Sequence, residues 1–110
     1  EGHGNEVFYE WTMKFKNLKD MEKEIKHRFV LGGHKSYYLL KALLRVQIIL
    51  VSVMPDYQAV NVFNLKTARA ANDALRDAFE IAGQNAKVWT MPYGNITLPV
   101  VKASEERAEA

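Results

Sequence analysis

Apolar residues in the first half of the chain recur every three or four positions. After an opening loop, this spacing predicts a short helix that buries aromatic side chains, with Asn5 as its N-cap. A second helix is predicted over Leu18–Val30, where apolar residues share one side and Lys and Glu the other. The Gly32-Gly33 pair then ends that helix, and a third helix is predicted from about Lys35 to Arg45.

The second half of the chain contains short apolar runs that are typical of strands. Gln47–Val53 is continuous and rich in β-branched residues, as expected for a strand buried on both faces of a parallel sheet. Val60–Phe63 and Lys87–Met91 are two further candidate strands. Between them, Thr67 is a candidate N-cap for a helix that ends just before Gly83.

This order of elements predicts an α/β fold with a layered, mainly parallel sheet flanked by helices. We expect one domain over residues 1–101, followed by a polar tail over residues 102–110 that frays because it has no apolar stripe. Ligands of such sheets gather beyond the carboxyl ends of the strands, which here are residues 52–56 and 91–94.

Composition narrows the class of protein. Hydrophobic residues make up 48% of the chain and charged residues 25%, as in ordinary globular proteins, and the net charge is only +2. Because basic residues do not gather into a face with interleaved aromatics, nucleic acid is not an expected partner. The chain has no cysteine and no apolar run near the ~20 residues that cross a bilayer, so we expect no disulfide, no membrane span and a cytoplasmic location.

Two glycine breaks carry the candidate functional residues. Gly2 and Gly4 flank His3, so the backbone there can approach a ligand closely while presenting an imidazole. Spacing alone, however, favours a simple turn ahead of a helix. Gly32-Gly33 is followed by His34 and Lys35 at a predicted helix N-terminus, where backbone N–H groups attract carboxylate or phosphate. A flexible connection with both side chains in solvent fits the same local features.

The rest of the chain offers no local catalytic motif. The three histidines lack the spacing of a metal site, and His27 falls on the polar side of its helix, so no metal site built from this chain alone is expected. The sequence has no phosphate-binding glycine fingerprint and no nucleophile elbow. We interpret the aromatics Trp11, Trp89, Tyr37 and Tyr38 as core or half-buried residues.

Four segments nevertheless form an ordered pattern. Glu1–Trp11 contains Gly-His-Gly followed by Phe-Tyr, and Gly32–Lys35 precedes a helix. Ile48–Ser52 follows that helix, and Ala86–Gly94 contains a strand-like run and a Pro-Tyr-Gly turn. This set resembles the C-terminal domain of the nickel-dependent lactate racemase family, and the resemblance runs from Glu1 to about residue 99.

The resemblance implies a two-domain enzyme with its active site between the domains. Family members carry a nickel pincer nucleotide attached to a lysine of the N-terminal domain, which also supplies the nickel-ligating histidine. Their proposed chemistry is reversible hydride transfer from a 2-hydroxy acid to the cofactor. A Gln and a Lys near the substrate come from a helix upstream of the Gly-His-Gly loop, so the resemblance places no catalytic residue in this chain.

The same resemblance implies roles for the two glycine breaks. His34 falls where the lactate racemase has a tryptophan close to the substrate, so His34 and Lys35 are the expected substrate-binding residues. The loop Gly2-His3-Gly4 is expected near the cofactor. Because an imidazole replaces an indole, we expect a small 2-hydroxy acid that is not necessarily lactate.

By this resemblance the chain begins inside an incomplete C-terminal domain, just after a strand that the family would have before Glu1. We therefore expect it to pair with an N-terminal domain, to hold no cofactor by itself and to be inactive alone. A missing strand also leaves an open sheet edge, which favours self-association.

Two alternative functions from other classes of protein stay open. A non-catalytic α/β binding or assembly module would keep the fold without the chemistry, and the presence of an upstream domain in the parent gene distinguishes it from the racemase or epimerase. A free nucleotide-binding domain predicts affinity for simple nucleotides, which the missing glycine fingerprint disfavours.

Overall fold

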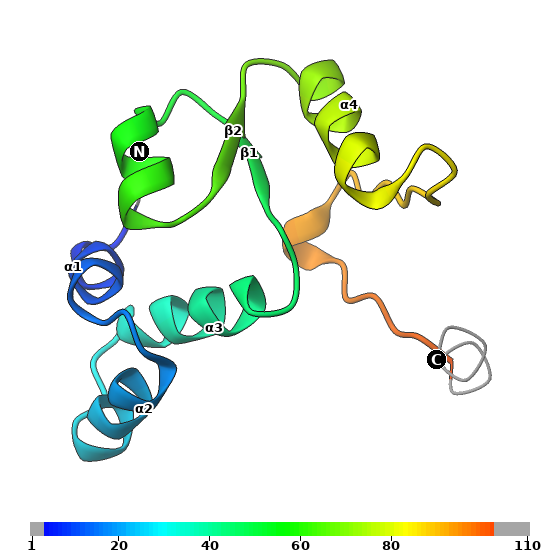
Figure 1. Ribbon diagram of the computed structural model, residues 1–110. Coiled ribbons are helices and arrows are strands. Elements are labelled where there is room, and N and C mark those ends of the chain that lie inside the picture. Colours follow the sequence, from blue (N-terminus) through cyan, green and yellow to red (C-terminus); the bar gives the residue numbers. More distant parts are fainter. Residues whose placement is uncertain (1–3, 103–110) are drawn as a thin grey trace.

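The computed structural model describes residues 4–102 and is drawn in Figure 1. In chain order, its elements are the helices α1 (Glu6–Lys14), α2 (Leu18–His27) and α3 (Gly33–Leu43), the strand β1 (Ile49–Val51), the π-helix η1 (Tyr57–Val62), the strand β2 (Lys66–Ala68), the helix α4 (Ala71–Ala82) and the 3-10 helix η2 (Gly94–Ile96). Helices therefore accompany a small parallel sheet, which is consistent with the α/β class.

The three N-terminal helices lie close to their predicted positions, and side-chain caps explain two of the starts. Asn5 Oδ1 accepts a hydrogen bond from the Val7 N–H at 2.8 Å, and Asn17 Oδ1 accepts from the Lys19 N–H at 2.7 Å. These bonds satisfy N–H groups that have no partner inside the helix. The predicted second helix was too long, because α2 ends at His27 and the chain is already extended at Arg28.

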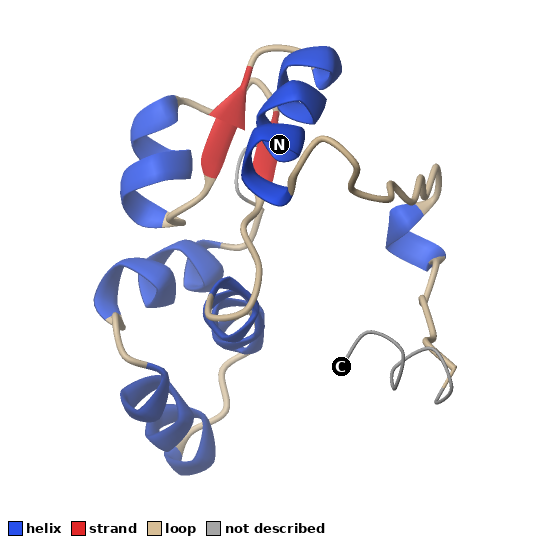
Figure 2. Ribbon diagram, turned by 45° about the vertical axis from the view of Figure 1, so that its right-hand side comes forward, coloured by secondary structure: helices blue, strands red, loops and turns tan. Residues whose placement is uncertain are grey.

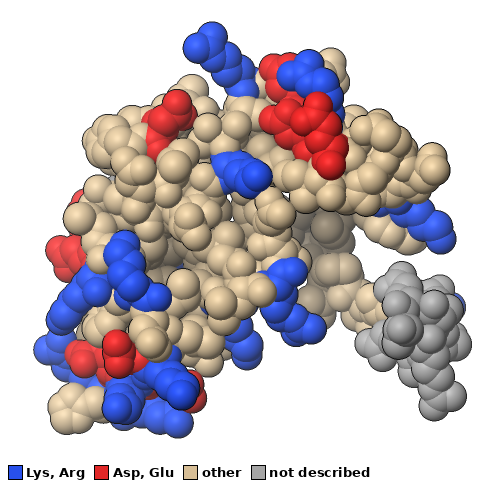
Figure 3. All heavy atoms as spheres, viewed as in Figure 1, with Lys and Arg blue, Asp and Glu red and all other residues tan. Residues whose placement is uncertain are grey.

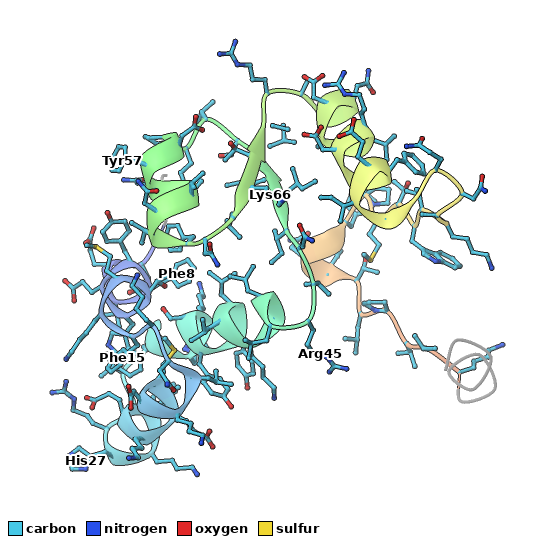
Figure 4. The ribbon with its side chains drawn as sticks, in the orientation of Figure 1. Phe8, Phe15, His27, Arg45, Tyr57 and Lys66 are labelled. Carbon is cyan, nitrogen blue, oxygen red and sulfur yellow. The ribbon has the colours of Figure 1, made fainter. Side chains whose placement is uncertain are left out.

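The core lies between α1, α2, α3 and η1. Its buried apolar side chains are Trp11, Met21, Ala59 and Phe63. The Phe63 ring stacks on Phe8 of α1 with centroids 4.9 Å apart, and Tyr9 meets it edge-on at 5.9 Å. In Figure 4 the labelled Phe8 lies where α1 approaches η1. Burial of these aromatic rings is the main force that holds η1 against the helices.

One polar side chain is buried within this helical core. Ser36 of α3 is 1% exposed, and its hydroxyl donates to the Phe8 carbonyl at 2.7 Å. Thr12 Oγ1 lies 2.7 Å from the same carbonyl and 3.0 Å from Ser36 Oγ. The two hydroxyls therefore form one small network that joins α1 to α3 and satisfies the buried serine.

The sheet has two short strands. β1 and β2 run parallel in the register Ile49↔Lys66, Leu50↔Thr67 and Val51↔Ala68, and α4 packs against both of them. The sequence correctly predicted a parallel strand at the β1 position. The expectation that this strand is buried on both faces was wrong, because Ile49 and Leu50 are only half-buried and Val51 is exposed.

The predicted strand at Val60–Phe63 was wrong, because this segment belongs to η1 and its C-cap. Its two buried residues, Ala59 and Phe63, are four positions apart, which is the spacing of a helical face. Asn64 then adopts φ 57°, and this left-handed residue turns the chain out of η1 towards β2.

The predicted N-cap at Thr67 was also wrong. Thr67 lies in β2, where the neighbouring Lys66 N–H donates to the Ile48 carbonyl at 3.0 Å. Helix α4 begins later, after Ala70, which provides no side-chain cap. The end of this helix was predicted correctly, since Gly83 follows it with φ 106°, a conformation that side chains rarely adopt.

The predicted third strand at Lys87–Met91 does not form in the described part of the chain, where these residues are loop. Figure 2 shows the segment after α4 running away from the two strands. Trp89 is 85% exposed and Tyr38 is 63% exposed, so the expectation that they are core or half-buried was wrong, whereas Trp11 and Tyr37 agree with it. A strand needs a neighbour for its backbone groups, and this segment has none among residues 4–102.

Candidate functional site

The first glycine break is described only from Gly4 onward. Gly4 has φ 79°, and Asn5 after it is extended and caps α1. Local geometry therefore agrees with a turn that leads into a helix. Gly2 and His3, which we expected near a cofactor, lie outside the described residues.

The second glycine break packs against helix α1 and its N-cap residue. A Cβ atom on Gly32 would lie 2.6 Å from Asn5 Oδ1, and one on Gly33 would lie 2.6 Å from Trp11 Cε3. Both distances are too short for real contacts. A side chain at Gly33 would have to displace the buried Trp11 ring, and one at Gly32 would have to displace the Asn5 amide that caps α1. Gly32 also has φ 101°, which adds a conformational reason for glycine. Tertiary structure thus brings together two motifs that are far apart in the sequence.

His34 stands beside this contact, in the first turn of α3. Its Nδ1 accepts a hydrogen bond from the Gly32 N–H at 3.2 Å, so the neutral imidazole carries its proton on Nε2. The ring is half-buried and stacks on Phe29, with centroids 5.7 Å apart and planes at 28°. A fixed ring with a free N–H donor is suited to binding a carboxylate or hydroxyl oxygen.

Phe29 is the residue that sequence reasoning did not select for this site. It was expected on the inner face of a long helix, but it lies beyond the end of α2 and is 61% exposed. One sequence feature could have identified Phe29 as a site residue: it lies only five residues before His34, across a glycine turn. Lys35, the other expected substrate residue, is exposed in the same turn of α3.

The last part of the sequence pattern, the Pro-Tyr-Gly turn, is not brought to the contact between Asn5 and Gly32. Tyr93 is 70% exposed, and η2 lies apart from α1 and from the start of α3 in both Figure 1 and Figure 2. A cavity of about 280 Å³ lies between α1, α3 and η1, but its lining includes Thr12, Ser36 and Phe63 and not His34. The candidate site is therefore the surface around Gly4, Asn5 and Gly32–Lys35.

Charged side chains of the described surface gather around α2 and form ion pairs. Lys and Arg side chains crowd around α2 in Figure 3, where Lys26 pairs with Glu22 at 3.3 Å and Arg28 with Glu24 at 3.5 Å. These exposed pairs stabilise the helix only weakly.

Within residues 4–102 no three His, Asp or Glu side chains are grouped so that they could hold a metal ion, so the described residues do not fit a nickel site. None of the described helices is long and apolar enough to cross a membrane.

Comparison with known proteins gives one match. The family model for the lactate racemase C-terminal domain matches residues 1–98, which includes both glycine breaks and the sheet. Searches of curated proteins and of solved structures found no significant match. Because the family model covers most of the chain, the protein belongs to the lactate racemase C-terminal domain family.

Proposed function

We propose that this chain serves a 2-hydroxy-acid racemase or epimerase as the C-terminal domain that lines its interdomain cleft. The domain comprises residues 1–101, with residues 102–110 as a tail, and pairs with an N-terminal domain in the cytoplasm. In that context its short sheet becomes part of a layered, mainly parallel one. The observation that carries the proposal is the contact between Asn5 and Gly32, which joins the two family motifs at one surface.

In this proposal His34 and Lys35 bind the substrate. The His34 Nε2–H donates to an oxygen of the 2-hydroxy acid, and the hydrogen bond from Gly32 to Nδ1 holds the ring in place. The Lys35 ammonium adds positive charge for the carboxylate, together with the N-terminal end of α3. The exposed Phe29 ring beside His34 offers apolar area to the substrate's side chain.

The nickel pincer nucleotide, when bound to the whole enzyme, supplies the hydride acceptor. In this proposal the N-terminal domain holds this cofactor, as the family resemblance implies, and the described residues of this chain contribute no ligand cluster to it. The loop Gly2-His3-Gly4 contributes a wall close to it, since small residues there allow close approach of the backbone. It follows that the chain alone does not racemise its substrate.

The test uses the parent protein expressed with its upstream domain, with nickel content, intact mass and racemisation measured together. We expect His34→Ala to raise KM for the 2-hydroxy acid about tenfold, the effect of losing roughly one charge-assisted hydrogen bond. His27→Ala is the matched control, because His27 is exposed at the end of α2, as Figure 4 shows. Unchanged KM and kcat in the His34 variant would refute the assignment.

A non-catalytic binding or assembly module is the second candidate, and the exposed apolar surface of the chain favours it. That reading predicts a parent protein without nickel and without racemase activity, in which His34→Ala has no effect on function. Nickel bound in equal amount to the parent protein, together with racemisation, would exclude it.

A further inference from the structure

The chain exposes more surface than its mass explains. Its accessible surface is 9156 Å², whereas a compact monomer of 12.6 kDa has about 6,200 Å². Its radius of gyration is 16.0 Å, compared with about 13 Å for a compact domain of this length. If full exposure is allowed for every residue outside 4–102, an excess of roughly 1,000 Å² remains. Each partner in a standard protein interface buries about 800 Å², so the excess is large enough for one.

Much of this surface belongs to one segment, Val88–Val101, here called the C-terminal strip. It contains no charged residue, although charged residues make up 25% of the chain. Its exposed large side chains are Val88, Trp89, Met91, Tyr93, Ile96, Leu98, Val100 and Val101. Depletion of charge together with exposed aromatic and aliphatic side chains is typical of the centre of a protein interface.

The end of the strip has the form of an unpaired strand. After η2, Leu98 and Val100 alternate along it and are each about 80% exposed, at 84% and 80%. Thr97 is extended, with φ −108° and ψ 124°. In the described structure no backbone N–H from Thr97 to Lys102 donates to another backbone group. The segment is therefore ready to pair with the edge of a sheet.

The same chain offers a matching edge. β1 pairs only with β2, so its other edge is open, and a groove of about 460 Å³ lies beside it between the end of α3 and α4. The groove is lined mainly by apolar side chains, with Arg45 and Gln47 at its rim. The opposite edge of the sheet begins with the exposed Lys66, a residue type that discourages strand addition. The edge of β1 is therefore the acceptor.

We propose that two copies of this chain form a closed dimer in which the strip of each lies in the β1 groove of the other. The C-terminal strip and the open β1 edge occur on the same chain. A two-fold exchange between two copies therefore pairs both strips and both edges at once. Pro92 and Pro99 interrupt the strip and limit strand addition, which favours a closed dimer over a fibre. This inference does not depend on the proposed function.

The test is the mass of the full chain by light scattering and sedimentation over about 1–100 μM, since a dimer responds to concentration. We expect a particle of twice 12.6 kDa. Leu98→Lys in the strip and Val46→Lys in the groove should each raise the dimer Kd about 100-fold or more, as for a central interface residue. Leu31→Lys is the matched control, because Leu31 is 70% exposed but lies on the α2–α3 connection.

Hydrogen exchange gives a second readout that does not depend on particle mass. Amides of residues 96–101 and of β1 should gain protection together as the dimer forms, and lose it together in Leu98→Lys. Circular dichroism checks that the variants keep the helix content of the parent chain. A monomeric mass over the whole concentration range would overturn the dimer, as would equal disruption by Leu31→Lys or protection confined to one of the two segments.

Discussion

Gly33 packs its backbone against the ring of Trp11, so closely that a Cβ atom would lie 2.6 Å from Cε3 and 2.7 Å from Cζ3. The ring is 7% exposed and is itself held edge-on by Phe15 at 5.3 Å. It therefore has little freedom to move away from an added methyl group. This contact fixes the start of α3 against α1 and, with it, the position of His34.

Gly33→Ala should destabilise the protein by about 1–3 kcal/mol, the usual effect of forcing extra volume into a packed core. The measurement is urea unfolding followed by circular dichroism. Gly94→Ala is the matched control, because nothing lies within 4 Å of a Cβ there, and its unfolding free energy should be nearly unchanged. Equal unfolding free energies for the two variants would contradict the packing.

Phe63→Ala should be the more damaging of two phenylalanine truncations. Phe63 is 2% exposed and stacks with Phe8 and Tyr9, so its removal should cost about 3–5 kcal/mol. Because domains are stable by only about 5–15 kcal/mol, the variant should be close to unfolding. Phe29→Ala, at a ring that is 61% exposed, should cost much less in the same denaturation experiment.

The Thr12–Ser36 pair should show coupling in a double-mutant cycle. Ser36→Ala and Thr12→Val each remove one hydroxyl from the network on the Phe8 carbonyl, at a cost of about 1 kcal/mol apiece. The double variant should lose less than the sum, because each hydroxyl supports the other. Strictly additive unfolding free energies would show that the two hydroxyls act independently.

His34 should adopt a single tautomer. Since Nδ1 accepts from the Gly32 N–H, the ¹⁵N spectrum at alkaline pH, where imidazoles are neutral, should show the proton on Nε2. The exposed His27 serves as the comparison in the same spectrum and should show averaged tautomers. Averaged signals for His34 would mean that the hydrogen bond does not hold the ring in solution.

Local sequence determined the elements whose signals are local. The caps at Asn5 and Asn17, the end of α4 at Gly83 and the parallel strand β1 each depend on a few neighbouring residues. The sequence analysis named Asn5 as an N-cap but not Asn17. Asn17 nevertheless has the same local signal, a short polar side chain directly before a helix. The family pattern in residues 1–98 is likewise a property of the order of residues.

Other features depended on contacts between distant residues. The segment around Val60 is rich in strand-forming residues, but burial of Phe63 against Phe8 makes it helical. Trp89 was expected in a strand, yet a strand forms only where a neighbour satisfies its backbone, and in the described structure neither strand of the sheet pairs with this segment.

The sequence by itself determined that two glycine breaks carry the candidate chemistry. The fold decided that the second break packs against Asn5 and Trp11, two residues that follow the first break. The sequence around Gly32 and Gly33 predicts only an ordinary glycine turn. The requirement for glycine arises because Asn5 and Trp11 occupy the space where side chains would be. Close packing between helices, which no short segment encodes, therefore places His34 beside the start of α1.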